Sequence, residues 1–259
     1  SPGPVDIFVG ASFDYIPTVD MDRTQGLALK AKLEKEKVMI DFTKFNVTTT
    51  PGDDVNDSSS RGPSLPNFDI KPDVSAPGTN ILSTIPSFAV GDNYSKAYAQ
   101  YTGTSMATPH ISGVSALLKE LHPEWTPFDI KSALSNTAKH LDKSKFDVFS
   151  QGAGLVQPLE AATATSLFKV AHETEVNGVK QTHTRGTIAF GNQVPTSKAQ
   201  VITKTIDVQK LSSDDNYAIE VETTRPSKSG ATVTTDVQSI QSGKVTVNLN
   251  IPAGTPVQG

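Results

Sequence analysis

Cysteine is absent from the 259 residues of this sequence. Its absence excludes disulfide bonds, cysteine-ligated zinc and thiol catalysis, and it is compatible with both secreted and cytosolic proteins. A surplus of basic residues is also lacking, because 23 Lys and Arg stand against 27 Asp and Glu, which gives a formal net charge of -4. So mild a charge, spread along the chain, does not indicate nucleic-acid binding or attachment to a membrane surface.

Long apolar runs are missing as well. No stretch approaches the roughly 18 apolar residues that a membrane-spanning helix needs. The first residues do not combine a basic segment with an apolar one, so we expect no recognisable leader in this sequence. Because 36% of the 259 residues are hydrophobic, the composition predicts a globular protein with one large domain or two ordinary ones.

Histidine is missing from the first 109 residues, although the chain contains five. This absence bears on the stretch from Gly103 to His110, Gly-Thr-Ser-Met-Ala-Thr-Pro-His, which reads like the setting of a reactive serine. A serine hydroxyl is a weak nucleophile unless a base accepts its proton. The sequence therefore predicts a nucleophile, Ser105, with no histidine ahead of it in the chain.

The first part of the chain predicts a short strand, a helix and a loop. Residues 5–9 have the apolar, β-branched character of a strand. Asp22 is a suitable cap for a helix that carries Leu27, Leu29 and Leu33. The zone ends near Val47, and residues 48–66 are rich in Asp, Ser, Gly and Pro, as a connecting loop would be.

The middle part predicts three helices. From Ser105 onward, apolar residues recur at steps of three and four, which predicts a helix with one apolar stripe. We expect it to end at His122, a second helix to begin at Thr126 with proline in its first turn, and a short third one to begin at Pro158 and end by Ser166. The stripe consists of Ala107, Ile111, Val114, Leu118 and Leu121.

In the last part, the apolar period changes from 3.6 to 2. Polar and apolar residues alternate over 202–208, 217–221 and 245–251, and turn-rich pieces separate these segments. Short alternating strands with turns between them predict a β-sandwich.

The position of Ser105 at a helix start supplies half of what a nucleophile needs. The first N–H groups of a helix lack intrahelical partners, and the positive end of the helix dipole favours a developing negative charge. The ordinary alternative is that Thr104 or Ser105 only caps the helix, as serine and threonine commonly do.

The whole octet Gly103 to His110 resembles the nucleophile signature of the subtilisin-like serine proteases and matches it at every fixed position. Residues 58–63, 70–78 and 152–156 are similar to the strands and turns that surround the nucleophile in that family, so that the resemblance covers roughly residues 55–165. It implies an α/β fold in which a parallel sheet is flanked by helices, represented here by its C-terminal portion.

The resemblance assigns roles to five residues. Ser105 is the catalytic nucleophile, and its own backbone N–H is one donor to the oxyanion. Gly103, Thr104 and Met106 are the substrate-binding residues beside the scissile bond, and Met106 is also sensitive to oxidation. His110 is structural rather than the base, because the family's order along the chain is Asp, His, Ser.

The same resemblance implies that most of the catalytic machinery lies elsewhere. The family's aspartate, histidine and oxyanion-hole asparagine all precede the serine, so we expect this chain to be the C-terminal part of a larger secreted bacterial protease and to be inactive alone. His122 and His140 lie beside expected helix ends, and His172 and His183 fall in or next to the expected sandwich.

The resemblance also suggests domains and partners. Residues 1–47 are similar to the end of a protease-associated insert domain, residues 48–166 to the C-terminal part of the catalytic domain, and residues 167–259 to a fibronectin-like sandwich that follows it. Protein or peptide substrates are expected outside the cell or at its envelope. The cell wall and the N-terminal part of the protease are further candidate partners.

Other readings remain open at this point. An α/β-hydrolase would need glycine where Ala107 stands, and the Ser-x-x-Lys of residues 166–169 lacks the companion motifs of a β-lactamase. A non-catalytic binding or adhesion fragment of a cell-envelope protein is the main alternative. No cofactor or metal is expected in this chain, although calcium is compatible with a longer parent; the acidic pairs 53–54, 69/73 and 214–215 lack the spacing of a calcium loop.

Overall fold

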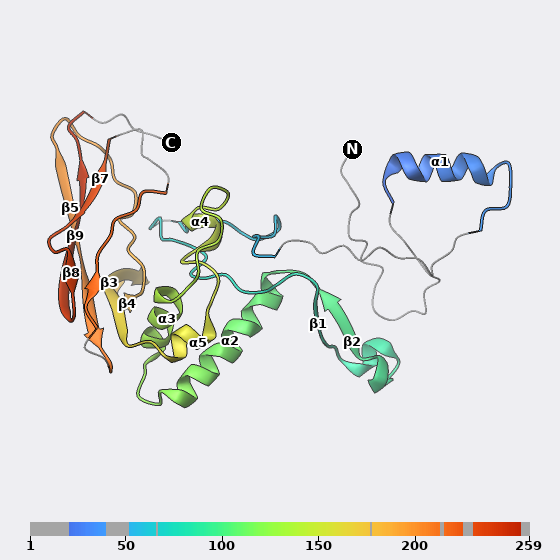
Figure 1. Ribbon diagram of the computed structural model, residues 1–259, viewed down its shortest axis with the longest axis horizontal. Coiled ribbons are helices and arrows are strands. Elements are labelled where there is room, and N and C mark those ends of the chain that lie inside the picture. The colour runs from blue at the N-terminus through green and yellow to red at the C-terminus, as the bar shows by residue number, and fades with distance from the viewer. Residues whose placement is uncertain are drawn as a thin grey trace. The chain divides into compact units, whose positions relative to one another are not determined.

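The computed structural model describes residues 21–39, 52–65, 67–176, 178–212, 215–224 and 230–254. The chain divides into two compact units, one made of Ser1–Gly52 and Asn80–Tyr101, the other of Asp53–Thr79 and Thr102–Gly259 (Figure 1). Among the described helices, none has the length and apolar character needed to cross a membrane.

The first unit contains a helix and a hairpin. α1 (Arg23–Leu33) begins as predicted, because the Asp22 carboxylate accepts a 2.9 Å hydrogen bond from the Gln25 amide, but none of its side chains is buried. β1 (Ile81–Thr84) and β2 (Tyr98–Tyr101) pair antiparallel, with the 3-10 turns η1 (Ser87–Val90) and η2 (Tyr94–Lys96) between them. The strand predicted at 5–9 and most of the predicted insert domain at 1–47 lie outside the described residues.

The longest helix of the second unit is α2 (Thr104–Leu121), which confirms the helix predicted from Ser105. Its apolar stripe is only partly buried. Leu118 is 1% exposed, whereas Leu121, which the stripe predicted to be buried, is 62% exposed. Leu118 belongs to the hydrophobic core, and Ile111 and Val114 pack against that core, whereas Leu121 is not among the residues that pack there.

Three shorter helices follow. α3 (Pro127–Asn136) confirms the predicted start, and its cap is reciprocal: the Thr126 hydroxyl accepts from the Asp129 amide, and the Asp129 carboxylate accepts from the Thr126 amide. α4 (Val148–Gln151) is a single turn, and α5 (Pro158–Ala162) is the predicted third helix.

The strands of the last part form one antiparallel sheet of five and one pair. The sheet has the order β4-β3-β5-β9-β7, and the pair is β6-β8. The strands predicted around 202–208 and 245–251 are confirmed, but the third prediction, 217–221, shortens to two residues because its partner strand has only two. The bounds are β3 (Ser166–Val176), β4 (Val179–Arg185), β5 (Gln200–Lys210), β6 (Tyr217–Ala218), β7 (Thr232–Thr235), β8 (Ser239–Ile240) and β9 (Gly243–Ile251).

Two layers meet over the middle of this sheet. Val208, Val245 and Val247 form its buried centre, and Ile219 and Ile240, from the region of the β6-β8 pair, pack against them. In the part of the chain that the structure describes, the second layer is therefore much smaller than the first. A fibronectin-like sandwich remains a prediction.

Parallel pairing is limited among the described residues. It consists of a single bridge between Ser75 and Leu155, in which the Ser75 amide donates to Gly154 and the Ser75 carbonyl accepts from Val156. The segments 70–78 and 152–156 also meet where the Ala153 amide donates to the Asp73 carbonyl at 3.0 Å, but no parallel ladder extends beyond the bridge. The bridge nevertheless joins the two segments that the sequence predicted to surround the nucleophile.

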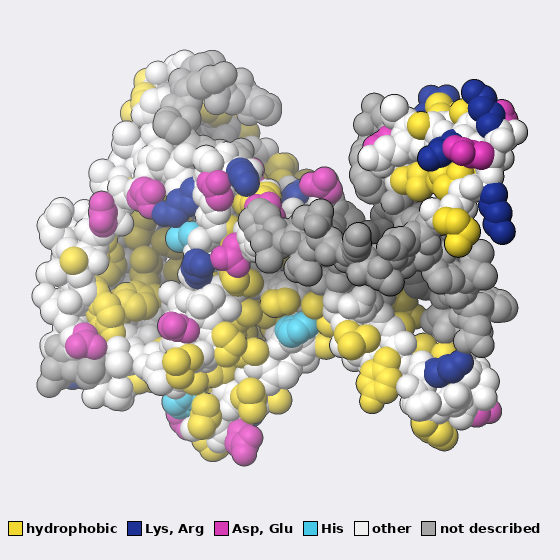
Figure 2. All heavy atoms as spheres, turned by 45° about the vertical axis from the view of Figure 1, so that its right-hand side comes forward, with side chains coloured by type: hydrophobic (Ala, Val, Ile, Leu, Met, Phe, Trp, Pro, Cys, Tyr) yellow, Lys and Arg dark blue, Asp and Glu magenta, His cyan; other side chains and the backbone are white. Residues whose placement is uncertain are grey.

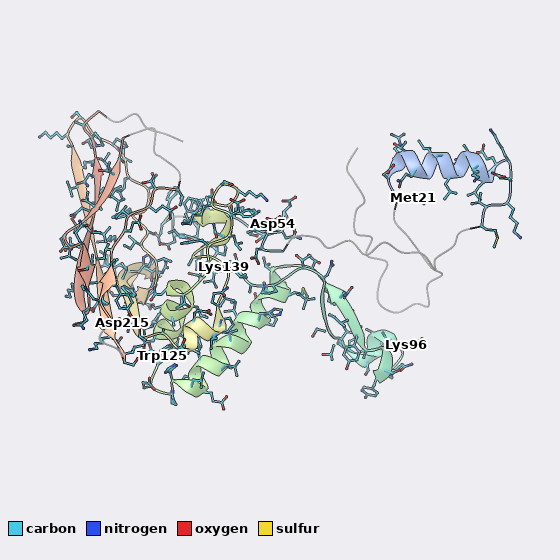
Figure 3. The ribbon with its side chains drawn as sticks, in the orientation of Figure 1. Met21, Asp54, Lys96, Trp125, Lys139 and Asp215 are labelled. Atoms are coloured by element: carbon cyan, nitrogen blue, oxygen red, sulfur yellow. The ribbon has the colours of Figure 1, made fainter. Side chains whose placement is uncertain are left out.

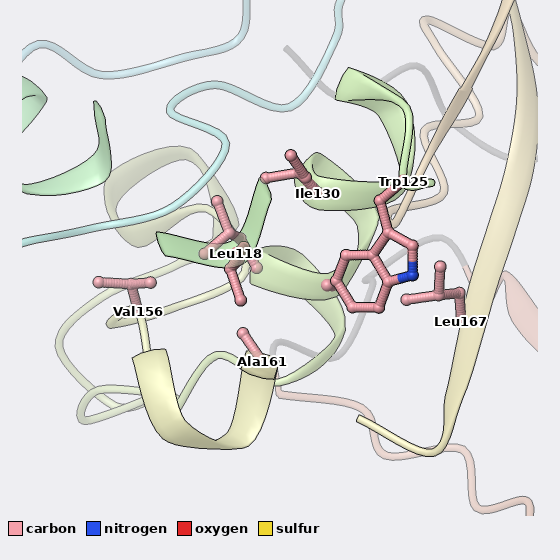
Figure 4. Packing of buried hydrophobic residues seen from close by; sticks show 8 residues of the cluster. Leu118, Trp125, Ile130, Val156, Ala161 and Leu167 are labelled. Atoms are coloured by element: carbon pink, nitrogen blue, oxygen red, sulfur yellow. The ribbon is translucent and has the colours of Figure 1, made fainter. Parts of the chain in front are cut away.

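One hydrophobic core joins the helices to the start of the sheet. Its centre is the Trp125 indole, 3% exposed, which lies with Leu167 of β3 on one side and Leu118 and Ala161 on the other (Figure 4). Trp125 stands at the turn between α2 and α3 (Figure 3). Burying large apolar side chains of this kind stabilises a fold by about 1.5–3 kcal/mol each. The buried members are Leu118, Trp125, Ile130, Ala133, Leu134, Val156, Ala161 and Leu167.

Candidate active site

Ser105 lies in the first turn of α2, and its side chain is exposed. Gly103 is the N-cap, and its carbonyl accepts from the Met106 and Ala107 amides at 3.0 and 3.3 Å. Thr104 and Ser105 are the first two residues of α2, and the N–H groups at this position in a helix have no carbonyl acceptor within the helix. This is the arrangement that the sequence predicted for stabilising an oxyanion.

Residues 75–78 contact the start of α2. The Gly78 carbonyl accepts a 2.8 Å hydrogen bond from the Gly103 amide. A Cβ on Gly78 would lie 2.8 Å from the Gly103 carbonyl oxygen and 3.2 Å from Ala107 Cβ, so only glycine allows this approach. The position of Ser105 is therefore coupled to that of Gly78.

The segment 75–78 is in turn fixed by the chain around Gln151. The Ser75 hydroxyl donates to the Gln151 carbonyl at 3.0 Å, and the Gln151 side chain, 3% exposed, accepts from the Leu141 amide and donates to the Phe146 carbonyl. Gly152 adopts φ +65, and a Cβ there would lie 2.4 Å from the Pro72 carbonyl oxygen. Gln151 thus contacts the segment 75–78, and that segment contacts the start of α2, which carries Ser105. The sequence did not predict the contacts of Gln151.

All five histidines lie in the described part of the chain, and none of them hydrogen bonds with Ser105. His110 follows Ser105 by five residues, about 140° around the helix, and its Nδ1 donates to the Met106 carbonyl at 2.9 Å. The structure thus gives His110 a structural hydrogen bond, as predicted. Within the residues described, the Ser105 hydroxyl has no hydrogen-bond partner.

The other histidines serve the packing of the fold. His122 stacks on Trp125 with ring centroids 3.9 Å apart, and its Nε2 contacts the Ala162 carbonyl at 2.9 Å, so that it is a packed residue rather than a solvated one. His140 is exposed. His172 and His183 stand opposite each other on the paired strands β3 and β4, a pairing that the sequence did not predict.

The three substrate-binding residues predicted beside Ser105 differ in exposure. Thr104 is exposed, while Gly103 and Met106 are half-buried. The Thr104 and Met106 carbonyls already accept side-chain hydrogen bonds, from Thr108 and His110. Their roles in binding substrate remain predictions.

The acidic residues that invite a metal are paired with cations. Asp53 contacts Lys139 at 2.9 Å, and Asp54 contacts Lys145 at 3.6 Å. Asp69 contacts Arg185 at 3.2 Å. Nowhere in the described ranges are three or more His, Asp or Glu side chains arranged so that they could hold a metal ion.

Asp73 is the acidic residue nearest in sequence to the segment that supports Ser105. It accepts from Lys71 at 2.6 Å and pairs with Lys131 at 2.9 Å. Burial raises the pKa of Asp73, but the two lysines outweigh burial and hold the pKa below its ordinary value of 3.8. Asp73 is therefore ionised at neutral pH and fixes the chain between Gly62 and Ser75 to α3.

Charges of both signs are interspersed over the face of the molecule seen in Figure 2, and hydrophobic side chains are exposed between them. The figure shows no broad surface of one sign on this face.

Comparisons with known proteins match the part of the chain that contains Ser105 to a known family. Residues 20–154 match the model of the family described as "Subtilase family". The chain is 40% identical over 155 residues to minor extracellular protease Vpr of Bacillus subtilis, covering 59% of this chain and 19% of that protein. It is 46% identical over 110 residues to subtilisin-like protease SBT1.9 of Arabidopsis thaliana, covering 40% of this chain and 15% of that protein.

Among solved structures, the crystal structure of fervidolysin from Fervidobacterium pennivorans, a keratinolytic enzyme related to subtilisin, matches 51% of this chain and 24% of that one, with 25% identity and a TM-score of 0.30. The chain spans less than a quarter of the length of each of these three proteins, from 15% to 24%.

Proposed function

The chain belongs to the subtilase family, and from that membership we propose that it forms the nucleophile-bearing part of a serine endopeptidase. The observation that carries the proposal is the place of Ser105. It lies in the region matched to the family, its side chain is exposed, and it stands in the first turn of α2, where backbone N–H groups are available.

In the proposed reaction, the Ser105 oxygen attacks the carbonyl carbon of a peptide bond while a histidine outside this chain accepts the hydroxyl proton. The Ser105 amide donates to the oxyanion that forms. The histidine then gives its proton to the leaving amine, and water hydrolyses the acyl-enzyme. Gly103 and Thr104 lie beside the scissile bond, and Met106 lines the same site.

The remaining parts of the proposal concern the longer protein. We propose that it acts on proteins or peptides outside the cell or at its envelope, as the printed name of the relative Vpr, a minor extracellular protease, suggests. Residues 167–259 are proposed to be a fibronectin-like sandwich that holds or orients the protease, and residues 1–47 the end of a protease-associated insert. Calcium, if the longer protein uses it, is proposed to bind outside this chain.

A chimera tests the nucleophile directly. Residues 53–166 replace the matching segment of Vpr, which supplies the other catalytic groups, and the chimera is treated with a fluorophosphonate probe and assayed on a peptide substrate. We expect the probe to attach at Ser105, and Ser105→Ala to abolish both labelling and turnover. Labelling at another residue, or activity that survives Ser105→Ala, would contradict the proposal.

Ser112→Ala is the matched control for that experiment. Ser112 is exposed on the same helix two turns further on, so it lies on nearly the same face as Ser105, and its hydroxyl donates only to the Thr108 carbonyl at 3.2 Å. It should keep labelling and turnover. If the folded chimera and its Ser112→Ala variant are both inactive, the alternative of a non-catalytic binding fragment is favoured.

A further inference from the structure

A buried charged cluster joins the β3-β4 hairpin to Asp69, which forms an isolated bridge with Ser64. Asp69 and Arg185 form a two-point contact, with NH1 to Oδ1 at 3.2 Å and NH2 to Oδ2 at 3.4 Å. Their side chains are only 8% and 10% exposed. Charges buried to this degree are costly to separate, because the partner left behind has no water to replace the lost contact.

Two histidines complete this cluster, which we call the Asp69 cluster (Asp69, His172, His183 and Arg185). His172 Nε2 lies 3.2 Å from Asp69 Oδ1, the separation of an ion pair, although the ring nitrogen is not directed at the oxygen as a hydrogen bond requires. The two histidine rings are in edge contact, with centroids 5.1 Å apart, and His183 also stacks on Phe128 of α3 at 5.6 Å.

The contact between Arg185 and His183 fixes a protonation state. Arg185 Nε–H donates to His183 Nε2 at 3.3 Å, so this nitrogen must carry a lone pair. His183 is therefore neutral, with its proton on Nδ1, and a second proton could enter at Nε2 only by breaking the contact with Arg185. Protonation and the observed geometry exclude each other.

The charges around the two histidines also oppose protonation. Arg185 of β4 disfavours the charged form of both histidines, and Asp69 favours it. Lys204 of β5 also disfavours a charge on His172. Lys131 of α3 and Lys71 do the same for His183. Asp73 neutralises part of this field, since it holds Lys71 and Lys131. Burial, followed by Arg185, lowers the pKa of both His172 and His183 below the ordinary value of 6.5.

The Asp69 cluster lies at a mechanically important place. His172, His183 and Arg185 belong to the β3-β4 hairpin. Asp69 belongs to the segment that continues to Ser75, which pairs with Leu155. The same segment ends at Gly78, whose carbonyl accepts from the Gly103 amide at the start of α2. Release of Asp69 would free the beginning of the segment that supports Ser105.

We propose that the Asp69 cluster is an acid-sensitive latch, closed at neutral pH, that fastens the β3-β4 hairpin to the segment of residues 64–78. Opening of the latch exposes both histidines to water, where each accepts a proton more readily than in the closed state. The open state therefore binds more protons as the pH falls below about 6.5, and acid shifts the equilibrium toward it. The latch does not depend on Ser105 being a nucleophile.

The first test measures the histidines of the unmodified chain. Ring resonances followed by NMR between pH 8 and 4 should place the midpoints of His172 and His183 below 6.5. A midpoint at or above 6.5 for either ring overturns the proposal, because that ring would then stabilise the closed state in acid. This measurement needs no variant and so does not depend on whether a variant folds.

The second test measures opening by hydrogen exchange. Protection factors, corrected for the intrinsic effect of pH, should fall for amides of β4 and of residues 64–75 between pH 7.5 and 5, by at most about tenfold per pH unit for each proton taken up. In the double variant His172→Gln/His183→Gln this fall should disappear, whereas the exposed control His140→Gln should behave like the unmodified chain. An unchanged fall in the double variant, or none in the unmodified chain, overturns the latch.

Discussion

The Gly103 amide donates a 2.8 Å hydrogen bond to the Gly78 carbonyl, and the two glycines approach so closely that a Cβ on Gly78 would lie 2.8 Å from the Gly103 carbonyl oxygen. Gly103 is the residue from which α2 begins, and Ser105 follows it by two. The orientation of the exposed serine is thus set from outside its own helix. Substitutions in the supporting segment should therefore affect both stability and the site.

Gly78→Ala should destabilise the fold and displace the start of α2. The added Cβ would lie 2.8 Å from the Gly103 carbonyl oxygen, and backbone cannot yield as a flexible side chain can. Overpacking of this kind costs about 1–3 kcal/mol. Urea unfolding measures the loss of stability, and the Vpr chimera should lose turnover in parallel.

Gly113→Ala is the matched control. Gly113 lies on α2, and a Cβ added there would meet no atom within 4 Å. It should raise the free energy of unfolding by up to about 1 kcal/mol, since alanine is the better helix former. Equal effects of the two substitutions would show that Gly78 is not tightly packed.

Two neighbouring leucines of α2 should differ strongly in how much stability is lost when each is replaced by alanine. Leu118 is 1% exposed and Leu117 is 59% exposed. Leu118→Ala should cost about 2–5 kcal/mol through lost burial and a cavity, whereas Leu117→Ala should stay within about 0.5 kcal/mol. Thermal or urea unfolding of both variants checks the prediction, and a large loss from Leu117→Ala would place an unseen partner on that face.

Asn136 should be a specific link between α3 and the sheet. Its Oδ1 accepts from the Phe168 amide at 2.8 Å, and its Nδ2 donates to the Gly186 carbonyl at 3.2 Å. Asn136→Ala leaves both backbone groups without this partner and should cost about 1–3 kcal/mol. Gln181→Ala, on the exposed face of β4, serves as the control and should change the unfolding free energy by no more than about 0.5 kcal/mol.

Asp129 should contribute stability that acid removes. Burial raises its pKa, but hydrogen bonds from Lys169 and Thr126 outweigh burial and hold the pKa below 3.8. The folded state therefore favours the ionised form, so this stability is present above pH 3.8 and is lost as the pH falls through the lower, folded-state pKa.

Asp129→Asn should accordingly cost about 1–3 kcal/mol at pH 7, since a charge-assisted hydrogen bond is lost and Lys169 stays mostly buried. The difference between the variant and the unmodified chain should shrink toward pH 3. Unfolding curves at both values measure it, with exposed Asp57→Asn as the control. A difference independent of pH would mean that packing, not charge, explains the effect.

Local features of this fold could be predicted from the sequence because their causes are local. Asp22 and Thr126 begin helices through hydrogen bonds to residues three positions further on, and Pro158 stands in the first turn of α5, where its missing N–H costs nothing. The alternation within β5 and β9 reflects one buried face. The setting of Ser105 was predictable for the same reason, since Gly103 and the helix after it are adjacent in sequence.

The remaining features depend on partners that are distant in sequence. Asp69 and Arg185 are 116 residues apart, and no periodicity connects them. Gln151 looks like an ordinary polar residue until its side chain is seen to bridge Leu141 and Phe146. The predicted strand at 217–221 is short because the length of a strand is set by its partner, and Leu121 is exposed because an apolar stripe does not reveal how far its covering extends.

Leu167 is completely buried and lies one residue into β3, yet it packs beside the Trp125 indole and belongs to the same core as Leu118 and Ala161 of the helices (Figure 4). A recombination event that joined a different sheet after Ser166 would leave a leucine-sized hole against the indole. The sheet and the helices consequently cannot be exchanged independently between proteins, and a successful swap would have to carry this leucine, or its equivalent in shape, along with the helices.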